Sequence, residues 1–541
     1  MVFNNYSRWR FMLIPHGLTY FILSIVILFL VILTIIYGSL WRYERNLTRL
    51  ILSHTYAVEN GAIGFPQRLP NDGHYIQWTF LQMNDVYELL PLDKGRKGGL
   101  ARVAYLRQLL KEENSNTFTL LAGDLISPSA LSTAIVNGTA LNGKQMIATM
   151  NTLGLDYMTF GNHEFDYNHN ELLLRMNESK FTWISTNVFQ MNSSKSIGTS
   201  LTHKILTIDG VRILIIGLTV PSNLTYARFI DQASLINYIR QFLTQFPNGT
   251  YDVLVALTHL DIAQDIELAA KIPQIDLILG GHEHEDQYYL RGPKYIPLSK
   301  ADANAFTVFI HRCAYNIDTK KLRIHSTLTR ITSDIPEEKE TAIVAKYWYN
   351  LGIQAFATLG YPIEKTISCL PAGVELDGRS EAVRTSQTLL SDAICESMIT
   401  AASINQSTIA IFNSGAIRID DILRDTITGY DIVRILPYVN YIQVLSVPGQ
   451  ILARILTVGR SSKGNGMFLS YTGIQTPDQG VTWLVNGINV GTSGLNYTVI
   501  TIEYARLSTR FNNPNITLIQ TVNIAQTVAL MNYLQMKYPP C

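Results

Sequence analysis

Apolar runs that end at glycine or at a polar residue recur through the first half of the chain. Such runs predict buried strands when they are short and bounded by turn residues. They occupy residues 75–83, 117–123, 156–161, 211–220, 251–259 and 275–282. Residues 98–113 instead repeat apolar side chains at spacings of three and four, which predicts an amphipathic helix. Strands that alternate with helices indicate packed α/β layers, whose active sites gather at the carboxyl ends of strands.

The pattern changes near residue 333, where a charged, helix-like connector begins, and new strand-like runs appear at 407–415 and 440–447. A chain of 541 residues is too long for one ordinary core, so two folded domains are expected. We predict a first domain over residues 75–335, a helical linker or hinge over 336–362 and a second domain over 363–541.

One segment near the N-terminus differs in kind from the rest. Residues 17–40 carry no charged side chain, and about 20 apolar residues suffice to cross a bilayer as a helix. A cleaved signal peptide would have a shorter apolar region followed by a small-residue cleavage site, which "GSLWRYERN" does not provide. We therefore predict a cytoplasmic tail over 1–16, a single-pass transmembrane signal anchor over 17–41 and a polar stem over 42–74.

The net charge does not indicate a class of binding partner, because 43 basic and 42 acidic residues leave a net charge of +1. No long-range field recruits nucleic acid, so we expect no nucleic-acid partner. Arginines on both sides of the apolar segment leave its orientation open. N-glycosylation sequons after the apolar segment exceed the chance expectation and favour a glycoprotein whose body is extracellular or lumenal. They lie at Asn46, Asn137, Asn177, Asn192, Asn223, Asn248, Asn405, Asn496 and Asn515.

The four cysteines are too few and too scattered for a disulfide framework or a CxxC zinc site. Two alternatives stay open, a single disulfide pair or buried thiols. Cys395 and Cys313 are the candidates for buried thiols.

Five polar blocks stand where predicted strands end. A lone histidine at a strand end is more often a loop or core residue, but carboxylates, an amide and imidazoles together are the donors that Zn²⁺, Mn²⁺ or Fe²⁺ accept. Glycines before three of the blocks allow sharp turns and close approach to a phosphate. The side chains are Asp85, Asp124, Asn162, His163, Asp166, His259, His282 and His284.

These residues, in this order, resemble the calcineurin-like metallophosphoesterases, and residues from about 75 to 541 resemble the 5'-nucleotidase family. The resemblance implies an α/β fold: a four-layer α/β-β/α sandwich, then an α+β substrate-binding domain, here preceded by the transmembrane helix. It also implies two divalent ions, Zn²⁺ or Mn²⁺, which together activate a water and clamp the phosphoryl oxygens. One would be held by Asp85, Asp124 and His284, and the other by Asp124, Asn162, His259 and His282. His163, held by Asp166, would stabilise the phosphoryl transition state or protonate the leaving oxygen.

The second domain carries further resemblance. "FNSGAIRIDDI" resembles the family's Asn-Gly-Gly-Gly-Ile-Arg turn and implies that Asn413 and Arg418 contact the nucleotide. Phe468 in "GNGMFLSYTGI" matches the position of an aromatic ring that stacks on the base. Core packing is the alternative for Phe468, and a glycine turn with a surface arginine is the alternative for Arg418.

Three departures from the family pattern bear on function. Tyr87 stands where Asp-x-His is common, and a phenol is a poorer ligand near neutral pH. Ser386 replaces a phosphate-contacting arginine, with Arg384 two residues away. "IEYARLSTRF" stands where Gly-Gly-Asp-Gly-aromatic is usual, which leaves Tyr504 and Phe511 as the candidate substitutes for the second stacking ring.

The expected function is a membrane-anchored, metal-dependent phosphohydrolase that removes phosphate from nucleotides. The alternative is a catalytically weak or silent surface protein that keeps the fold and binds a nucleotide or a protein partner. The sequence does not determine the oligomeric state.

Overall fold

The computed structural model describes residues 24–40, 54–65, 68–358, 361–404 and 409–541. The chain forms two compact units, residues 1–55 and 56–541, and each is described by itself. Several predictions fall outside the described residues: the tail 1–16, part of the anchor, part of the stem, and the sequons at Asn46 and Asn405.

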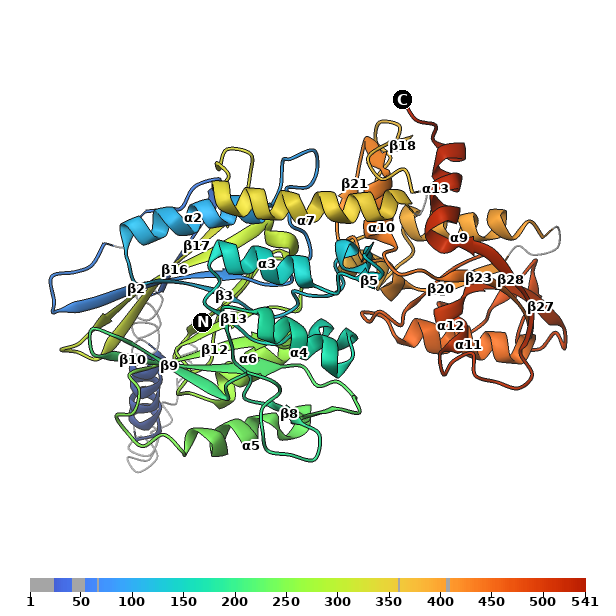
Figure 1. Ribbon diagram of the computed structural model, residues 1–541. Coiled ribbons are helices and arrows are strands. Elements are labelled where there is room, and N and C mark those ends of the chain that lie inside the picture. Colours follow the sequence, from blue (N-terminus) through green and yellow to red (C-terminus); the bar gives the residue numbers. More distant parts are fainter. Residues whose placement is uncertain (1–23, 41–53, 66–67, 359–360, 405–408) are drawn as a thin grey trace, which may run out of the picture. The chain divides into compact units, whose positions relative to one another are not determined.

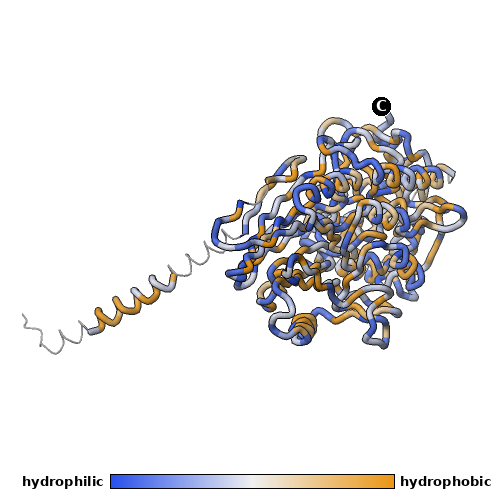
Figure 2. The backbone as a smooth tube through the Cα atoms, turned by 60° about the vertical axis from the view of Figure 1, so that its left-hand side comes forward, coloured by the Kyte–Doolittle hydropathy of each residue, from blue (hydrophilic) through white to orange (hydrophobic). Residues whose placement is uncertain are grey.

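Residues 24–40 form a helix whose apolar character is visible in Figure 2. In the part of the chain that the structure describes, none of the helices combines the length and the apolarity that crossing a membrane requires.

Two sheets form the framework of the first half of the second unit (Figure 1). The seven-stranded sheet has the order β1-β17-β16-β2-β3-β6-β7, and the six-stranded sheet has the order β14-β15-β13-β12-β10-β9. The strands of the first are β1 (His54–Asn60), β17 (Lys321–Arg330), β16 (Thr307–Asn316), β2 (Tyr75–Met83), β3 (Thr117–Leu121), β6 (Tyr157–Met158) and β7 (Thr182–Trp183). Those of the second are β14 (Gln287–Arg291), β15 (Ile296–Lys300), β13 (Leu277–Gly280), β12 (Val253–His259), β10 (Val211–Thr219) and β9 (His203–Ile208).

Strand β10 illustrates how the sequence creates layers. Successive side chains of a strand point to opposite faces. Ile213 and Ile215 accordingly pack into the core between the two sheets, whereas Leu214 and Ile216 pack against helices on the other face. A strand buried on both faces needs the unbroken apolar run that the sequence shows there.

Helices cover the outer faces of both sheets. Helices α2 (Leu100–Glu113), α3 (Lys144–Leu153) and α7 (Lys339–Thr358) lie side by side and share a core with the seven-stranded sheet (Figure 1). Helices α5 (Gln232–Leu243) and α6 (Ile262–Lys271) pack on the six-stranded sheet. Three cores therefore separate four layers, helix, sheet, sheet and helix, as predicted. Helix α4 (His169–Glu178) follows the polar block at residue 161.

The second half of this unit has one mixed sheet of the order β24-β20-β27-β23-β28, in which β20 and β27 are parallel and the other neighbours antiparallel. Its strands are β20 (Ile409–Asn413), β23 (Tyr441–Pro448), β24 (Leu469–Thr472), β27 (Asn496–Ile502) and β28 (Thr517–Ala525). Its helices are α8 (Ser380–Val383), α9 (Leu389–Ala402), α10 (Gly429–Ile435), α11 (Gly449–Ser461), α12 (Glu503–Leu507) and α13 (Gln526–Lys537). They share one apolar core with the sheet, which is an α+β arrangement.

Short two-stranded antiparallel sheets complete the described chain. They pair β4 (Ile135–Val136) with β5 (Thr139–Ala140), β8 (Val188–Gln190) with β11 (Ala227–Phe229), β18 (Thr366–Cys369) with β22 (Thr426–Thr428), β19 (Leu376–Asp377) with β21 (Ile422–Leu423), and β25 (Leu484–Val485) with β26 (Ile488–Asn489).

The structure resolves the alternatives left open for the cysteines. Cys369, at the end of β18, forms a disulfide with Cys541, and the two Cα atoms lie 5.7 Å apart. Cys313 and Cys395 are free and buried, which confirms them as buried thiols. A bond that closes a loop of this length removes conformational freedom from the unfolded chain and ties α13 to β18.

Candidate active site

The five polar blocks meet because their strands run parallel in each sheet. β2, β3 and β6 are parallel neighbours in one sheet, and β12 and β13 are parallel neighbours in the other. Their carboxyl ends therefore open on the same edge of the sandwich. This edge is where open α/β sheets bind their ligands.

Two carboxylates and one imidazole form the centre of the site. Ligating atoms of Asp85, Asp124 and His259 all lie within 4.8 Å of one another, and all three residues are buried. The Nδ1–H of His259 donates to the carbonyl of Ala122 (2.7 Å), which leaves Nε2 facing Asp124 Oδ2 at 3.3 Å. A carbonyl on one ring nitrogen fixes the tautomer that presents the other nitrogen to a metal. The donor set therefore fits a divalent cation.

The glycines predicted to matter here allow the strand ends to approach one another. Gly123 has a φ of 81°, and a Cβ on it would lie 2.6 Å from both the Gly161 nitrogen and the His259 ring. A Cβ on Gly161 would lie 2.0 Å from Asp124 Oδ1. Asp85 and Asp124 themselves adopt left-handed backbone conformations, with φ of 53° and 59°. Such conformations are costly for non-glycine residues and cluster at functional sites.

Asn162 supports a cation at this centre independently. Its side-chain Oδ1 is buried and has no hydrogen-bond partner among the described residues. An orphaned buried acceptor is rare, because it forfeits the hydrogen bond that it would make with water. Its amide oxygen is therefore available to a ligand such as a cation.

Charges within the cluster stabilise one another. Burial disfavours the charged form of Asp124, but His259 and His163 more than offset this and hold its pKa far below the usual range. Burial also opposes protonation of His259, yet Asp124 and Asp85 raise its pKa to about 9. Without a cation, the imidazole therefore carries the positive charge that the two carboxylates require.

Two further predicted ligands, His282 and His284, reach the same carboxylate. The backbone N–H of His282 donates to Asp85 Oδ2 at 2.9 Å, and its Nδ1 lies 3.3 Å from His259 Nε2. His284 Nε2 lies 3.3 Å from Asp85 Oδ1. The structure thus brings together side chains or backbone of five of the six predicted metal ligands, Asp85, Asp124, His259, His282 and His284. The role of Asn162 and the assignment of ligands to individual ions stay predictions.

Tyr87, the residue at the first-block departure, lies among the predicted ligands. Its hydroxyl lies 3.1 Å from Asp124 Oδ2, 3.3 Å from Asp85 Oδ1 and 3.4 Å from His284 Nε2. Burial and the two carboxylates raise the pKa of this phenol well above 10. The group is therefore a neutral hydrogen-bond donor in the described structure.

His163 and Asp166 form a second, adjacent pair. His163 Nδ1 donates to Asp166 Oδ2 (2.8 Å), which also accepts from Ser127 Oγ (2.7 Å). Burial disfavours the charged carboxylate, but His163 and Ser127 hold the pKa of Asp166 below its usual range. His163 Nε2 is thereby left as an acceptor, and Arg418 Nη1 donates to it at 3.2 Å.

Glu164 is a positioning residue for which the sequence indicated no role. Its buried carboxylate accepts from the backbone N–H groups of Asp124 (2.9 Å), Leu125 (2.7 Å) and Gly161 (2.5 Å). Burial and repulsion from Asp124 raise its pKa to about 7. It clamps two ligand loops together. Its place inside the polar block "GNHEFD" was the available signal, and the structure puts it in a 3-10 helix (His163–Asp166).

Family comparisons fit this geometry. Residues 79–286 match the calcineurin-like phosphoesterase family, and residues 370–517 match the 5'-nucleotidase C-terminal domain. The chain is a calcineurin-like phosphoesterase with a 5'-nucleotidase C-terminal domain. It is an enzyme of the metal-dependent phosphoric ester hydrolase class.

Individual relatives are distant in sequence. The chain is 25% identical over 445 residues to the "5'-nucleotidase" of Homo sapiens, covering 73% of this chain and 74% of the human protein. The structure of a "5'-nucleotidase precursor" from Thermus thermophilus superposes with a TM-score of 0.70 at 20% identity, over 86% of this chain and 97% of that one. The "Sulfate thiohydrolase SoxB" structure from the same organism superposes with a TM-score of 0.63 at 14% identity, over 87% and 96%. At these identities the structural matches show the fold alone.

Residues of the 5'-nucleotidase C-terminal domain and Asp166 line a cavity of about 570 Å³. Asp166 lies on its wall together with Asn413, Arg418, Tyr438 and Tyr504. Asn413 Oδ1 and Arg418 Nε are buried without a hydrogen-bond partner in the described chain. Buried polar atoms without a partner beside a cavity are suited to hydrogen-bonding a ligand.

Phe468 does not line this cavity. Its side chain is 5% exposed, which favours the core-packing alternative over the predicted stacking role. Phe511 is buried in the core of the C-terminal domain. Tyr504, by contrast, is 57% exposed and lines the cavity. In the segment "IEYARLSTRF" it is therefore the candidate ring that a ligand could stack on.

Ser386 lies between two helices, since α8 ends at Val383 and α9 begins at Leu389, and its Oγ donates to the Ala382 carbonyl. Arg384 is half-buried, and desolvation together with the charge of Arg418 lowers its pKa. Two guanidinium groups thus lie near each other, a site suited to anionic groups.

Proposed function

We propose that the chain hydrolyses phosphoric esters of nucleotides, with the nucleoside held by the C-terminal domain and the phosphoryl group at the carboxylate–imidazole centre. The observation that carries this proposal is the cavity that joins Asp166 to Asn413, Arg418 and Tyr504. A substrate that spans it would place an anionic end at His163 and a flat base beside an exposed ring. The printed names of several relatives, including the human "5'-nucleotidase", agree with this substrate class.

Two divalent ions, Zn²⁺ or Mn²⁺, are proposed at the centre, one held by Asp85, Asp124 and His284 and one by Asp124, Asn162, His259 and His282. Such ions supply Lewis-acid stabilisation of the phosphoryl group and lower the pKa of water. The orphaned Asn162 Oδ1 and the close carboxylates support this assignment.

His163 is proposed as the group that meets charge on the reacting phosphoryl or leaving oxygen. Asp166 accepts from Nδ1, so Nε2, which contacts Arg418 in the described structure, is the nitrogen that a bound substrate would meet. In this role His163 is a catalytic residue, Asp166 a positioning residue and Arg418 a substrate-binding one. Developing charge in a site that excludes water is stabilised strongly by such prealigned groups.

The alternative of a catalytically silent surface protein is not favoured, because the proposed ligands and the His163–Asp166 pair are all present. The fold does not determine which ester is hydrolysed, since the structure named "Sulfate thiohydrolase SoxB" shares the fold. The substrate must therefore be tested directly.

Residues 17–41 are proposed to anchor the chain in a membrane as a single pass, with the catalytic body extracellular or lumenal. The support is the charge-free segment 17–40 and its exposed apolar side chains, such as Ile25, Leu28 and Phe29, at 52%, 61% and 59% exposure. Alkaline carbonate extraction tests this: the chain should stay with membranes, and an Ile27→Arg/Val31→Arg variant should be released. Release of the unchanged chain would contradict the anchor.

The decisive experiment measures phosphate release by the full-length chain from nucleoside mono-, di- and triphosphates, nucleotide sugars and an aryl phosphate. Mn²⁺, Zn²⁺ or a chelator is added in parallel. Chelator-sensitive release that prefers one nucleotide class supports the proposal. Release from the aryl phosphate alone would discard the nucleotide assignment, and no release from any substrate would contradict phosphohydrolase activity.

A further inference from the structure

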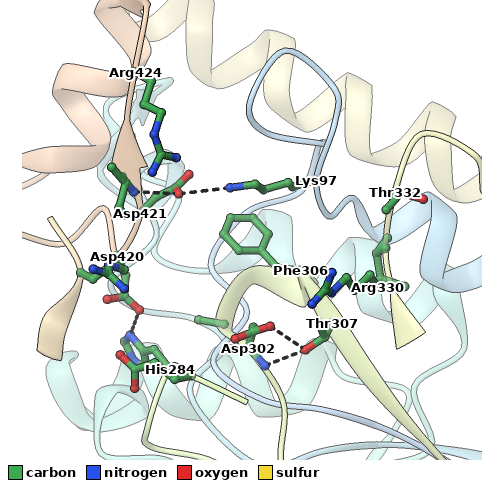
Figure 3. A pocket seen from close by; sticks show the side chains of 15 residues that line it. Lys97, His284, Asp302, Phe306, Thr307, Arg330, Thr332, Asp420, Asp421 and Arg424 are labelled. Atoms are coloured by element: carbon green, nitrogen blue, oxygen red, sulfur yellow. Dashed lines mark hydrogen bonds and ion pairs between the residues drawn. The ribbon is translucent and has the colours of Figure 1, made fainter. Parts of the chain in front are cut away.

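One residue of the C-terminal domain contacts a proposed metal ligand of the phosphoesterase domain. Asp420 Oδ2 accepts a hydrogen bond from His284 Nδ1, as the dashed line in Figure 3 marks. The two residues are 136 positions apart in the chain and belong to the two different family domains. Only the folded arrangement of both domains creates the contact.

The Asp420 carboxylate is fixed by a contact within the C-terminal domain. Its second oxygen accepts from the backbone N–H of Ser380 at 2.6 Å, and its side chain is 6% exposed. Its backbone is left-handed, with a φ of 46°. A buried acceptor with both oxygens in use presents a fixed geometry to His284.

His284 uses its other nitrogen toward the metal centre. Nε2 lies 3.3 Å from Asp85 Oδ1 and 3.4 Å from the Tyr87 hydroxyl. A carboxylate on one nitrogen fixes the ring orientation and tautomer and makes the opposite nitrogen a better ligand.

We propose that Asp420 is a positioning residue that completes the first metal site, so that metal affinity of the phosphoesterase domain depends on the C-terminal domain being docked as described. This inference rests on the proposed function. It extends that function by making one domain control the metal content of the other.

The test measures Mn²⁺ and Zn²⁺ affinity of the full-length chain by competition with a chromophoric chelator. Asp420→Asn keeps the size of the side chain but removes its charge, and we expect one of two ions to bind about 10- to 100-fold more weakly. The matched control is Asp421→Asn. Asp420, Asp421 and His284 line a second cavity of about 470 Å³, but Asp421 pairs with Lys97 at 3.6 Å rather than with His284 (Figure 3). The control should bind both ions as the unchanged chain does.

A double-mutant cycle separates positioning from a general structural effect. In a His284→Gln background, Asp420→Asn should cause no further loss of affinity, because the carboxylate acts through that ring. An equal loss in both backgrounds would overturn the inference. If Asp420→Asn fails to fold by thermal unfolding, Asp420→Glu carries the same cycle, with partial loss expected.

Two results distinguish a failure of this inference from a failure of the proposed function. Equal affinities for the unchanged chain and Asp420→Asn would overturn the inference and leave the proposed function standing. No metal binding by the unchanged chain would overturn both.

Discussion

Arg418 Nη1 lies 3.2 Å from His163 Nε2, although 255 positions separate the two residues. The guanidinium comes from the turn after β20, and the imidazole from the loop after β6. This contact places the predicted substrate-binding arginine directly beside the predicted catalytic histidine. Both roles can therefore be tested by separate kinetic effects.

Arg418→Ala should weaken substrate capture. A hydrogen bond to a charged group is worth about 1.5–3 kcal/mol, so kcat/KM for the preferred nucleotide should fall about 10- to 150-fold. Steady-state kinetics on the full-length chain provide the measurement. Arg424→Ala is the control, because Arg424 pairs with Glu375 and does not line the cavity that contains Arg418. An equal fall of kcat/KM in the control would contradict the substrate-binding role of Arg418.

His163→Ala should lower kcat far more than it raises KM. General acid–base groups contribute about 10²- to 10⁴-fold, and the loss should appear in kcat because the imidazole acts in the transition state. His169→Ala is a nearby control, since His169 stacks on Tyr226 rather than on the catalytic pair. A rise in KM equal to the fall in kcat would refute a transition-state role.

Replacing Tyr504 should weaken substrate binding, whereas replacing Phe468 should lower the stability of the fold. Tyr504→Ala removes an exposed ring from the cavity, and loss of base stacking of about 1–3 kcal/mol should raise KM about 5- to 150-fold. Phe468→Ala empties a buried site, and should lower the free energy of unfolding by about 3–5 kcal/mol. Kinetics and denaturant unfolding on both variants make the comparison; the reverse pattern would restore Phe468 as the stacking residue.

His311 should make the fold sensitive to acid. Burial lowers its pKa to about 3 from an ordinary value near 6.5, and its ring contacts Gln82, Ser299 and Ser326. The unfolded chain binds a proton that the folded chain excludes, so stability present above pH 6.5 is lost as pH falls toward 3. The loss approaches about 1.4 kcal/mol per pH unit.

His311→Gln tests this through unfolding midpoints between pH 7 and pH 4.5. The variant should show a shallower decline with acid than the unchanged chain, even if it is less stable at pH 7. His74→Gln, at a side chain that is 84% exposed, should keep the full decline. Parallel declines in all three chains would exclude His311 as the source.

The Cys369–Cys541 bond should stabilise the C-terminal domain. The 172-residue separation predicts a contribution of about 2–5 kcal/mol, because cross-linking restricts the unfolded chain. Reduction should lower the thermal midpoint of the unchanged chain but leave that of Cys541→Ser unmoved. A reductant-induced decrease of the same size in both would trace the effect to another group.

The sequence by itself determined the local elements and their order. Largely apolar runs at residues 75–83 and 211–220 became β2 and β10, because short runs bounded by turn residues favour buried strands. Polar blocks after such runs put Asp85, Asp124 and His259 at the carboxyl ends of strands, where ligands of α/β sheets bind. These features depend on neighbours in the chain, and pattern reveals them.

Tertiary structure alone decided which distant residues meet. It buried Phe468 and exposed Tyr504, paired Cys369 with Cys541, and brought Asp420 to His284. The periodicity of apolar residues does not predict such contacts, because each contact depends on how two segments that are distant in the chain pack together. The shape of the substrate cavity and the support of the metal ligands are set at that level, by packing rather than by propensity.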